Sequence, residues 1–486
     1  MIMRVLHSRR PDSYLFSLKA HDLNRRFSIN SLSQNYPFWC LIIFLVIVLM
    51  TGGGARADIQ SLVVLRPTAV VFLCIGLWGL RPSHVREYRF LFGMTAAIFM
   101  LVAIHLIPLP PSLWSTFPGR DVVTEIDRIA RLGDVWRPIS LVPSASWNSL
   151  FSLIIPLAVL VLAAQIHREQ RFKLLTVIIV LGLLSGFWGL LQAIGPSEGP
   201  LYLYRITNNG SAVGLFSNRN HQAIFLALLF PMLAVFASSG IRTVEQARLY
   251  GWLAVAACVI LIPLLLVTGS RAGLVAGVLG LGFALVLYRR PDISHPKKRK
   301  DRPRFDPRLL IGGFGAIMLG ALTFLMARAQ AVDRLSVEDE TDDLRFRIWG
   351  PIVEMAEKYF PLGSGAGSFV EVYQVGEFDN LLKVNYVNHA HNDWLEIYLT
   401  LGLPGLLLLG VAVVAFLTAA WRYFRSPVRD RRTSYGRLGA VVLFLLALAS
   451  IADYPLRVPS LACVFVIACI WLASPDSKLP KNAGTS

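Results

Sequence analysis

Long apolar stretches separated by short polar segments constrain this chain more than any other feature. Hydrophobic residues make up 55% of it and charged residues only 16%, whereas soluble proteins carry about 25% charged residues. The stretches that we assign as membrane spans are 38–51, 67–80, 90–108, 148–166, 174–194, 220–239, 250–267, 272–288, 309–328, 394–421, 438–452 and 459–473. Several are short for a bilayer that needs about 20 residues. We therefore expect an all-α, polytopic transmembrane helical bundle of about twelve spans.

The polar segments between the spans differ in charge on alternate sides. One set carries 31 Lys and Arg against 10 Asp and Glu, and the other carries 16 against 20. The basic set comprises 1–36, 81–89, 167–173, 240–249, 289–308, 422–437 and 474–486. Basic loops remain in the cytoplasm, so both termini are expected there. The net charge of +17 then indicates topology and anionic membrane lipids, and no nucleic-acid partner is expected.

This orientation divides the chain into a cytoplasmic N-terminal segment (1–36), a transmembrane domain (37–473) and a cytoplasmic tail (474–486). The external face holds the longer loops, of which 329–393 is the longest. A structureless loop of that size is unusual, so we expect it to be partly helical. Its residues 342–359 have helical apolar spacing, and Pro361 and Gly363 end that helix.

Two further features of the external loops have ordinary structural interpretations. Loop 109–147 contains a short amphipathic stretch at 122–132, which predicts a helix. The run Gly363-Ser364-Gly365-Ala366-Gly367 resembles a phosphate-binding loop, but it follows no strand and lacks the Lys-Ser/Thr pair. We interpret it as a turn that packs a helix.

Three polar clusters on the external face are candidates for chemistry. They are Arg205 to His221, Thr268-Gly269-Ser270-Arg271, and His389 to Glu396. Arg271 lies in a tight turn between two spans, where an arginine needs an anionic partner or water. It either extends to lipid phosphates or binds a diphosphate through bidentate hydrogen bonds.

The histidine cluster lies where a polar loop enters an apolar helix. One interpretation is a helix cap, with Asn392 or Asp393 as the N-cap residue. The other is acid–base chemistry, because histidine accepts a proton near neutral pH. Glu396 is either a polar residue on the helix face or a partner that orients the imidazole. No Asp-x-Asp pair occurs in an external loop, so metal-dependent use of a sugar nucleotide is not expected, and neither is a metal or cofactor site.

Four segments occur in the order found in the O-antigen ligase and polymerase superfamily. His391-Asn392-Asp393-Trp394-Leu395 through Gly402 resembles its His-Asn-x-x-Leu-x6-Gly motif. Ser217-Asn218-Arg219-Asn220 resembles its Asn-x-Asn segment, and Thr268 to Gly273 resembles its Ser-Arg turn. Pro361-Leu-Gly363-x-Gly365-x-Gly367 is also typical. The resemblance covers about 200–405.

The resemblance implies a membrane glycosyltransferase with a GT-C-like fold that takes a glycan from undecaprenyl diphosphate without a metal. It implies that His391 is catalytic and that Arg271 binds the diphosphate. The second diphosphate-binding arginine maps onto Arg205, with Arg219 as a nearby competitor. Supporting roles are expected for His389, Asn392, Glu396, Asn218 and Asn220. The implied location is the bacterial inner membrane, with a periplasmic site.

The acceptor is left open by these motifs. Ligases of the superfamily transfer the glycan to lipid A-core, polymerases to another lipid-linked glycan, and a third group to protein hydroxyls. A transporter without chemistry is the alternative of a different class. It predicts interrupted helices near mid-membrane and inverted repeats, and we find neither pattern in the sequence.

Overall fold

The computed structural model describes residues 29–290, 346–382 and 386–473, apart from 242 and 429. Most of this part of the chain is helical, and its strands are limited to one pair of two-residue strands. The elements up to the middle of the chain are α2 (Ile29–Thr51), α3 (Leu62–Gly79), α4 (Pro82–Glu87), α5 (Arg89–Ile104), β1 (Pro108–Leu109), α6 (Pro111–Trp114), α7 (Asp121–Ile129), β2 (Arg137–Pro138), α8 (Pro143–Ser152), α9 (Ile154–Ala163), α10 (Gln170–Ile194) and α11 (Arg219–Ser238). The remainder are α12 (Val244–Val267), α13 (Arg271–Leu287), α16 (Trp349–Tyr359), α17 (Phe369–Gly376), η1 (Asp379–Leu381), α18 (Asp393–Arg425), α19 (Arg431–Ala449), η2 (Pro455–Arg457) and α20 (Pro459–Leu472).

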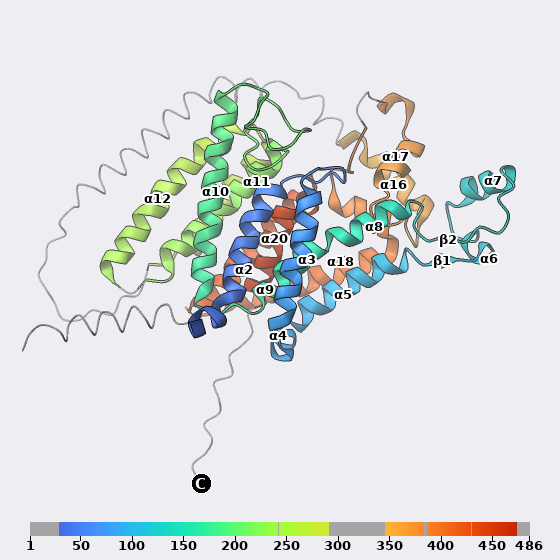
Figure 1. Cartoon of the computed structure of the whole chain (residues 1–486). Coiled ribbons are helices and arrows are strands. Elements are labelled where there is room, and N and C mark those ends of the chain that lie inside the picture. The colour runs from blue at the N-terminus through green and yellow to red at the C-terminus, as the bar shows by residue number, and fades with distance from the viewer. Residues whose placement is uncertain (1–28, 242, 291–345, 383–385, 429, 474–486) are drawn as a thin grey trace, which may run out of the picture.

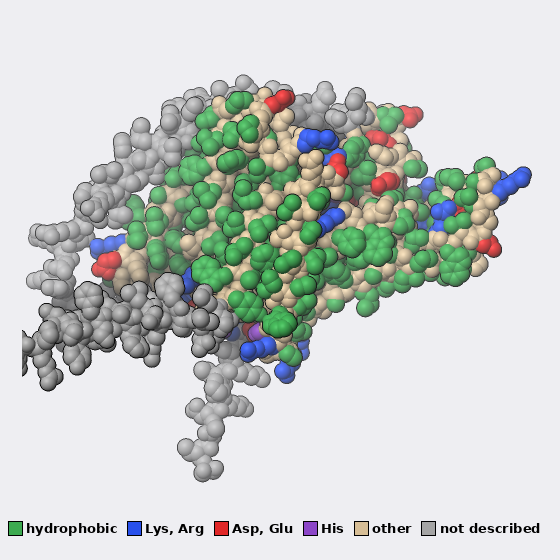
Figure 2. All heavy atoms as spheres, viewed as in Figure 1, with side chains coloured by type: hydrophobic (Ala, Val, Ile, Leu, Met, Phe, Trp, Pro, Cys, Tyr) green, Lys and Arg blue, Asp and Glu red, His purple; other side chains and the backbone are tan. Residues whose placement is uncertain are grey.

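The helical bundle confirms the expected helical class, and its long apolar helices suggest a membrane protein. Seven segments are long and apolar enough to cross a membrane, and four more apolar helices are shorter. Together they coincide with eleven of the expected spans. The other, 309–328, lies outside the described residues, so the count of twelve stays a prediction. Figure 2 shows hydrophobic side chains over most of the visible face of the bundle.

Helix α11 lies at the centre of the bundle. Nearly every residue from Asn220 to Ala237 is buried, and the helix packs against α10, α12, α13 and α19 (Figure 1). Its contact with α13 is close because Gly273 and Gly280 of α13 leave no side chain between the backbones. The first turns of α11 and α13 are therefore adjacent, and each turn begins with an arginine, Arg219 and Arg271.

Helix α18, in contrast, lies at the edge of the bundle. Apolar side chains spaced three or four residues apart are exposed along it: Leu403, Leu407, Val411, Val414 and Leu417. Such a stripe suits contact with lipid. Its first two turns differ, because Asp393, Glu396, Leu399 and Thr400 are buried.

A small layer of short helices beside the bundle covers those first turns. Helices α16 and α17 form a separate apolar cluster that includes Ile352, Tyr359, Phe369 and Tyr373 and extends to Leu399 of α18. The expected helix at 342–359 is thus present as α16 (Trp349–Tyr359), and residues 342–345 lie outside the described ranges. This layer positions the glycine-rich turn and the segment leading to the histidines above the bundle (Figure 1).

A second segment outside the long helices joins this layer through a buried arginine. Residues 105–142 form the β1–β2 pair with α6 and α7, and α7 coincides with the expected amphipathic helix. Arg120 Nη2 donates to the carbonyl of Ile139 at 2.6 Å and to that of Gly363 at 3.3 Å. Burial lowers the pKa of Arg120 to about 10, against the opposing effect of Tyr359. This arginine therefore links the segment to the glycine-rich turn.

Candidate active site

The site is built around the start of α18. Asn392 is the N-cap residue, and its side-chain oxygen accepts from the backbone N–H groups of Trp394 and Leu395 at 3.0 and 3.1 Å. His391, which precedes it, has a φ of 49°. A non-glycine residue in this region is uncommon, and such conformations cluster at functional sites. The cap and the acid–base interpretations are therefore compatible, because Asn392 caps the helix while the histidines stand just before it.

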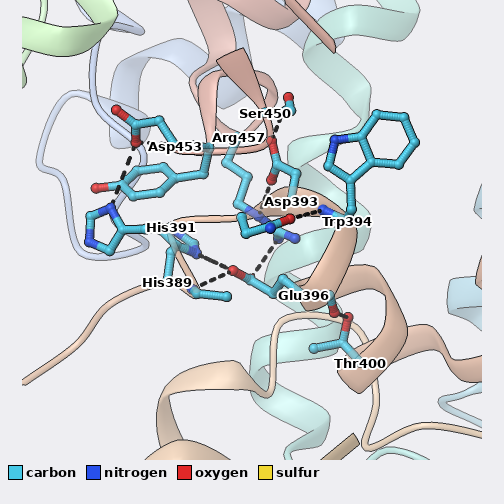
Figure 3. A network of polar contacts seen from close by, with 12 residues as sticks. His389, His391, Asp393, Trp394, Glu396, Thr400, Ser450, Asp453 and Arg457 are labelled. Atoms are coloured by element: carbon cyan, nitrogen blue, oxygen red, sulfur yellow. Dashed lines mark hydrogen bonds and ion pairs between the residues drawn. The ribbon is translucent and has the colours of Figure 1, made fainter. Parts of the chain in front are cut away.

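Glu396 is the centre of the first polar group. Its Oε1 lies 3.1 Å from Nδ1 of His389 and 3.1 Å from Nη1 of Arg457. Its Oε2 accepts from the backbone N–H of Ala390 at 3.0 Å. Figure 3 shows the carboxylate between the histidine and the arginine. Glu396 thus contacts the ring of His389 rather than that of His391.

Asp393 ties this group to the next helices. Its Oδ1 accepts from Arg457 Nε at 3.0 Å, and its Oδ2 accepts from the Ser450 hydroxyl at 3.1 Å. Its backbone N–H donates to the Ser450 carbonyl at the end of α19. Burial alone would lower the pKa of Arg457, but the carboxylates of Glu396 and Asp393 raise it above its usual value. The arginine is therefore a permanent cation that fixes the start of α18 against η2.

A second polar group surrounds Asp453, whose side chain is fully buried. Its Oδ1 accepts from its neighbour's backbone N–H, that of Tyr454, at 2.9 Å. The same oxygen lies 3.5 Å from Nε2 of His221 and 3.8 Å from Nδ1 of His391. The side chain of His221 is 1% exposed and that of His391 is 18% exposed. One carboxylate therefore faces two imidazoles, of which only His391 is open to solvent.

The ring of Tyr454 packs among three histidines. Its centroid lies 4.4 Å from that of His389, 5.0 Å from that of His391 and 5.1 Å from that of His221. The Tyr454 ring thus lies between the Glu396 group and the Asp453 group and contacts histidines of both. The two groups form one cluster contributed by α11, the segment before α18, α18 itself and the turn between α19 and α20.

A break in α18, below this cluster, leaves backbone N–H and C=O groups without their partners within the helix. Gly402 has φ 56° and ψ −146°, and Pro404 follows two residues later. The glycine-rich turn bonds to the interrupted backbone: Ser364 N donates to Leu399 O at 3.0 Å, Gly365 N to Thr400 O at 2.9 Å, and Pro361 O accepts from Leu403 N at 2.7 Å. The turn packs a helix, as expected, and it fixes the angle at which the first turns of α18 meet the membrane part.

The candidate arginines lie around the starts of α11 and α13. Ser270 caps α13 by accepting from Gly273 N at 3.0 Å, which leaves Arg271 as the exposed first residue of the helix. Arg219 is the first residue of α11, and its backbone N–H donates to Asn208 Oδ1 at 3.1 Å. Arg205 is exposed on the loop before α11. Helix N-termini favour anions, so two of the three arginines share their position with a helix dipole.

The two asparagines near Arg219 have structural contacts. Asn218 is the N-cap of α11, and its side chain accepts from the backbone N–H of Asn220 at 2.8 Å. Asn220 is buried. The next residue, His221, reaches Asp453. The first turn of α11 therefore runs from the arginine side of the site to the histidine side.

Sequence reasoning missed Asp453, Tyr454 and Arg457, and it did not single out His221 as a site residue. A signal was present, because Asp453 and Arg457 lie in the six-residue turn 453–458 between two expected spans, as Arg271 lies in a turn between two others. Charged residues at such a turn need partners. Within the described ranges, no set of three or more His, Cys, Asp or Glu side chains is arranged to hold a metal ion.

Comparison with known proteins supports the resemblance. Residues 256–410 match the model of the O-antigen ligase family. The matched range contains Arg271, the glycine-rich turn and the histidine segment, and it excludes Arg205, Arg219, His221, Asp453 and Arg457. A search of curated proteins found no match to the chain.

Proposed function

We propose that this helical protein, whose residues 256–410 match the model of the O-antigen ligase family, is a membrane protein that transfers a glycan, as the glycosyltransferase-like activity of that family suggests. The donor is a glycan on undecaprenyl diphosphate, and the acceptor is a hydroxyl group on the periplasmic face of the bacterial inner membrane. The observation that carries the proposal is the pairing of the partly exposed His391 with the buried carboxylate of Asp453.

His391 is the proposed general base. Its Nδ1 faces Asp453, so Nε2 is the nitrogen that meets the acceptor hydroxyl. Nε2 takes the proton as the hydroxyl oxygen forms a bond to the first sugar carbon of the donor. The bond from that carbon to the diphosphate breaks, and its electron pair leaves with the diphosphate. The Asp453 carboxylate stabilises the imidazolium, as a buried carboxylate does in other base–orienter pairs.

Arginine side chains neutralise the leaving group in this proposal. Arg271 is the first choice, because it combines a bidentate donor fork with the N-terminus of α13. Arg205 and Arg219 are the candidates for the second contact. His389, Glu396 and Arg457 hold the segment before α18 in place, and Asn392 caps the helix behind His391. No step in the scheme uses a metal.

A polymerase is the second candidate, and one observation favours it. The layer of α16 and α17 is folded around its own apolar cluster directly beside the start of α18, and a folded layer next to the site suits an extended glycan acceptor better than a small one. A ligase acting on lipid A-core and a transferase acting on protein hydroxyls use the same proposed site with a different acceptor.

The test is mass spectrometry of lipid-linked and lipid A-linked glycans in a strain that lacks this protein. Loss of glycan-capped lipid A, with full-length glycan retained on the lipid carrier, identifies a ligase. Accumulation of single repeat units on the carrier identifies a polymerase, and loss of glycan from proteins identifies the third activity. Unchanged glycans in all three pools would reject transfer chemistry in favour of transport or another role.

A further inference from the structure

A cavity of about 570 Å³ lies at the end of the bundle opposite the histidine cluster. It is formed by the start of α5, the end of α18 and the end of α20, together with Arg432 of α19. Its walls are apolar and include Phe90, Leu91, Ala415, Ala419 and Leu472. Nothing in the proposed transfer reaction uses this cavity.

The polar groups of the cavity are mostly basic. Three arginines line it, Arg89, Arg422 and Arg432, against one acid, Glu87. Arg432 packs over the ring of Tyr423, with 5.8 Å between its guanidinium carbon and the ring centroid. Arg89 and Arg422 are exposed, and within the described part of the chain neither side chain forms a hydrogen bond or an ion pair. The guanidinium groups of Arg89 and Arg422 are thus available to bind an anion.

The position of the cavity fits a membrane interface. From the break at Gly402 to Arg422, α18 runs for about 20 residues, which corresponds to roughly 30 Å at 1.5 Å per residue. That length matches the hydrocarbon thickness of a bilayer. Figure 2 shows basic side chains at this end of the molecule, beside α4. The segments here, 81–89 and 422–437, are also those whose basic charge predicts the cytoplasmic side.

We propose that this cavity binds the phosphodiester headgroup of an anionic membrane phospholipid, of the phosphatidylglycerol type. Arg89 and Arg422 contact the phosphate, and Arg432 adds charge from the side. The acyl chains lie along the apolar wall formed by α5 and α18. Basic pockets between membrane helices on the cytoplasmic side suit such lipids, and the excess of three arginines over one glutamate selects an anionic headgroup over a zwitterionic one.

The experiment measures lipid binding to the delipidated full-length protein by native mass spectrometry. The probes are phosphatidylglycerol and phosphatidylethanolamine with identical acyl chains, and inorganic phosphate as a competitor. The test variant is the double substitution Arg89→Gln/Arg422→Gln. We expect wild type to prefer phosphatidylglycerol at least tenfold, and the variant to bind it roughly 30-fold more weakly, because each arginine near an anionic surface contributes about a fivefold factor.

The matched control is Arg86→Gln/Arg425→Gln, which removes two charges from the same region without touching the cavity lining. It should change binding by less than about threefold. Equal losses in the two double variants would overturn the proposal in favour of general surface charge. Displacement of the lipid by millimolar phosphate would instead indicate a free-phosphate site, and equal binding of the two lipids would remove headgroup selectivity; both results contradict the proposal.

A second variant keeps the test valid if the glutamine variant folds poorly. Arg89→Lys/Arg422→Lys retains both charges and should keep the preference within about fivefold, because a lysine ammonium still binds phosphate as a point charge. Loss of the preference in a folded lysine variant would also overturn the proposal. Phosphatidylglycerol should raise the melting temperature of wild type but not of the glutamine variant, since a ligand that binds only the folded state stabilises it.

Discussion

Two histidines approach the carboxylate of Asp453, but they differ in exposure and in backbone conformation. His221 is sealed inside the bundle, whereas His391 is partly exposed and has a positive φ. A positioned base contributes typically 10²–10⁴-fold to a reaction rate. We therefore expect His391→Ala to lower the transfer rate by about that factor while the protein still inserts and folds, measured with purified protein and a lipid-linked donor. His389→Ala should be milder, because its ring contacts Glu396. Equal activity of His391→Ala and wild type would reject the proposed base.

Substitution of Arg271 tests the proposed binding of the diphosphate leaving group. Arg271→Lys keeps the charge but loses the bidentate fork. A hydrogen bond to a charged group is worth roughly 1.5–3 kcal/mol, so the transfer rate should fall about tenfold or more. Arg205→Ala and Arg219→Ala, assayed in parallel, identify the second arginine by the larger loss. Full activity in Arg271→Ala would show that this residue faces lipid rather than donor.

The two ion pairs of Arg457 lead to a prediction about the thermal stability of the protein. Its guanidinium neutralises two carboxylates, Glu396 and Asp393, whose side chains are 1% and 9% exposed. Removing one partner of a buried ion pair costs about 3–5 kcal/mol, because it leaves an uncompensated charge. Arg457→Met should therefore unfold at a markedly lower temperature, and the addition of Glu396→Gln should recover part of the loss. If the double variant is as unstable as the sum of the single variants, the two side chains do not interact energetically.

These residues also show what a sequence alone gives at this scale. The histidine segment and Arg271 were predicted because apolar helices make their polar neighbours conspicuous. Asp453 and Arg457 were not, although they interrupt two spans in the same manner. The choice of partners was not predictable, because Glu396 follows both histidines closely along the chain and only the fold decides that it contacts His389, seven residues before it.

At the scale of elements, the break in α18 is the feature that sets the site apart from the membrane part of the helix. A Cβ atom on Gly402 would lie 2.2 Å from the carbonyl oxygen of Pro361, and the residue has a φ of 56°. Gly402→Ala should therefore lower both the melting temperature and the transfer rate. Gly410→Ala in the same helix is the control, since no atom of the described structure lies within 4 Å of its added Cβ. The two variants should differ clearly in thermal unfolding, and identical behaviour would mean that the break does not hold the site.

Hydropathy predicted where most of the helices lie, because an apolar run in a membrane has few alternatives to a helix. It did not predict the break, although Gly402 and Pro404 mark it within an expected span. The hydrogen bonds between the glycine-rich turn and α18 join residues about 40 positions apart in the sequence, so no local sequence pattern predicts them. The layer formed by α16 and α17 was expected only as a partly helical loop.

At the scale of the whole molecule, the charge distribution makes a prediction about topology. The histidine cluster and the basic cavity lie at opposite ends of α18, and the basic segments coincide with the cavity end. Reporter fusions at Gly376, in α17, and at Ser426, after α18, should therefore report opposite sides of the membrane. The Ser426 fusion should be cytoplasmic. A report of the same side from both fusions would contradict the arrangement of spans.

The site can be completed only late in the synthesis of the chain. His221 meets its carboxylate partner Asp453 only after 232 further residues have been made, which takes roughly 12–46 s at 5–20 residues per second. Throughout that interval the imidazole of His221 lacks its carboxylate partner. The site is complete only when the start of α18 and the last two spans, α19 and α20, have been added. A chain truncated before residue 453 therefore leaves the buried imidazole of His221 without the carboxylate of Asp453.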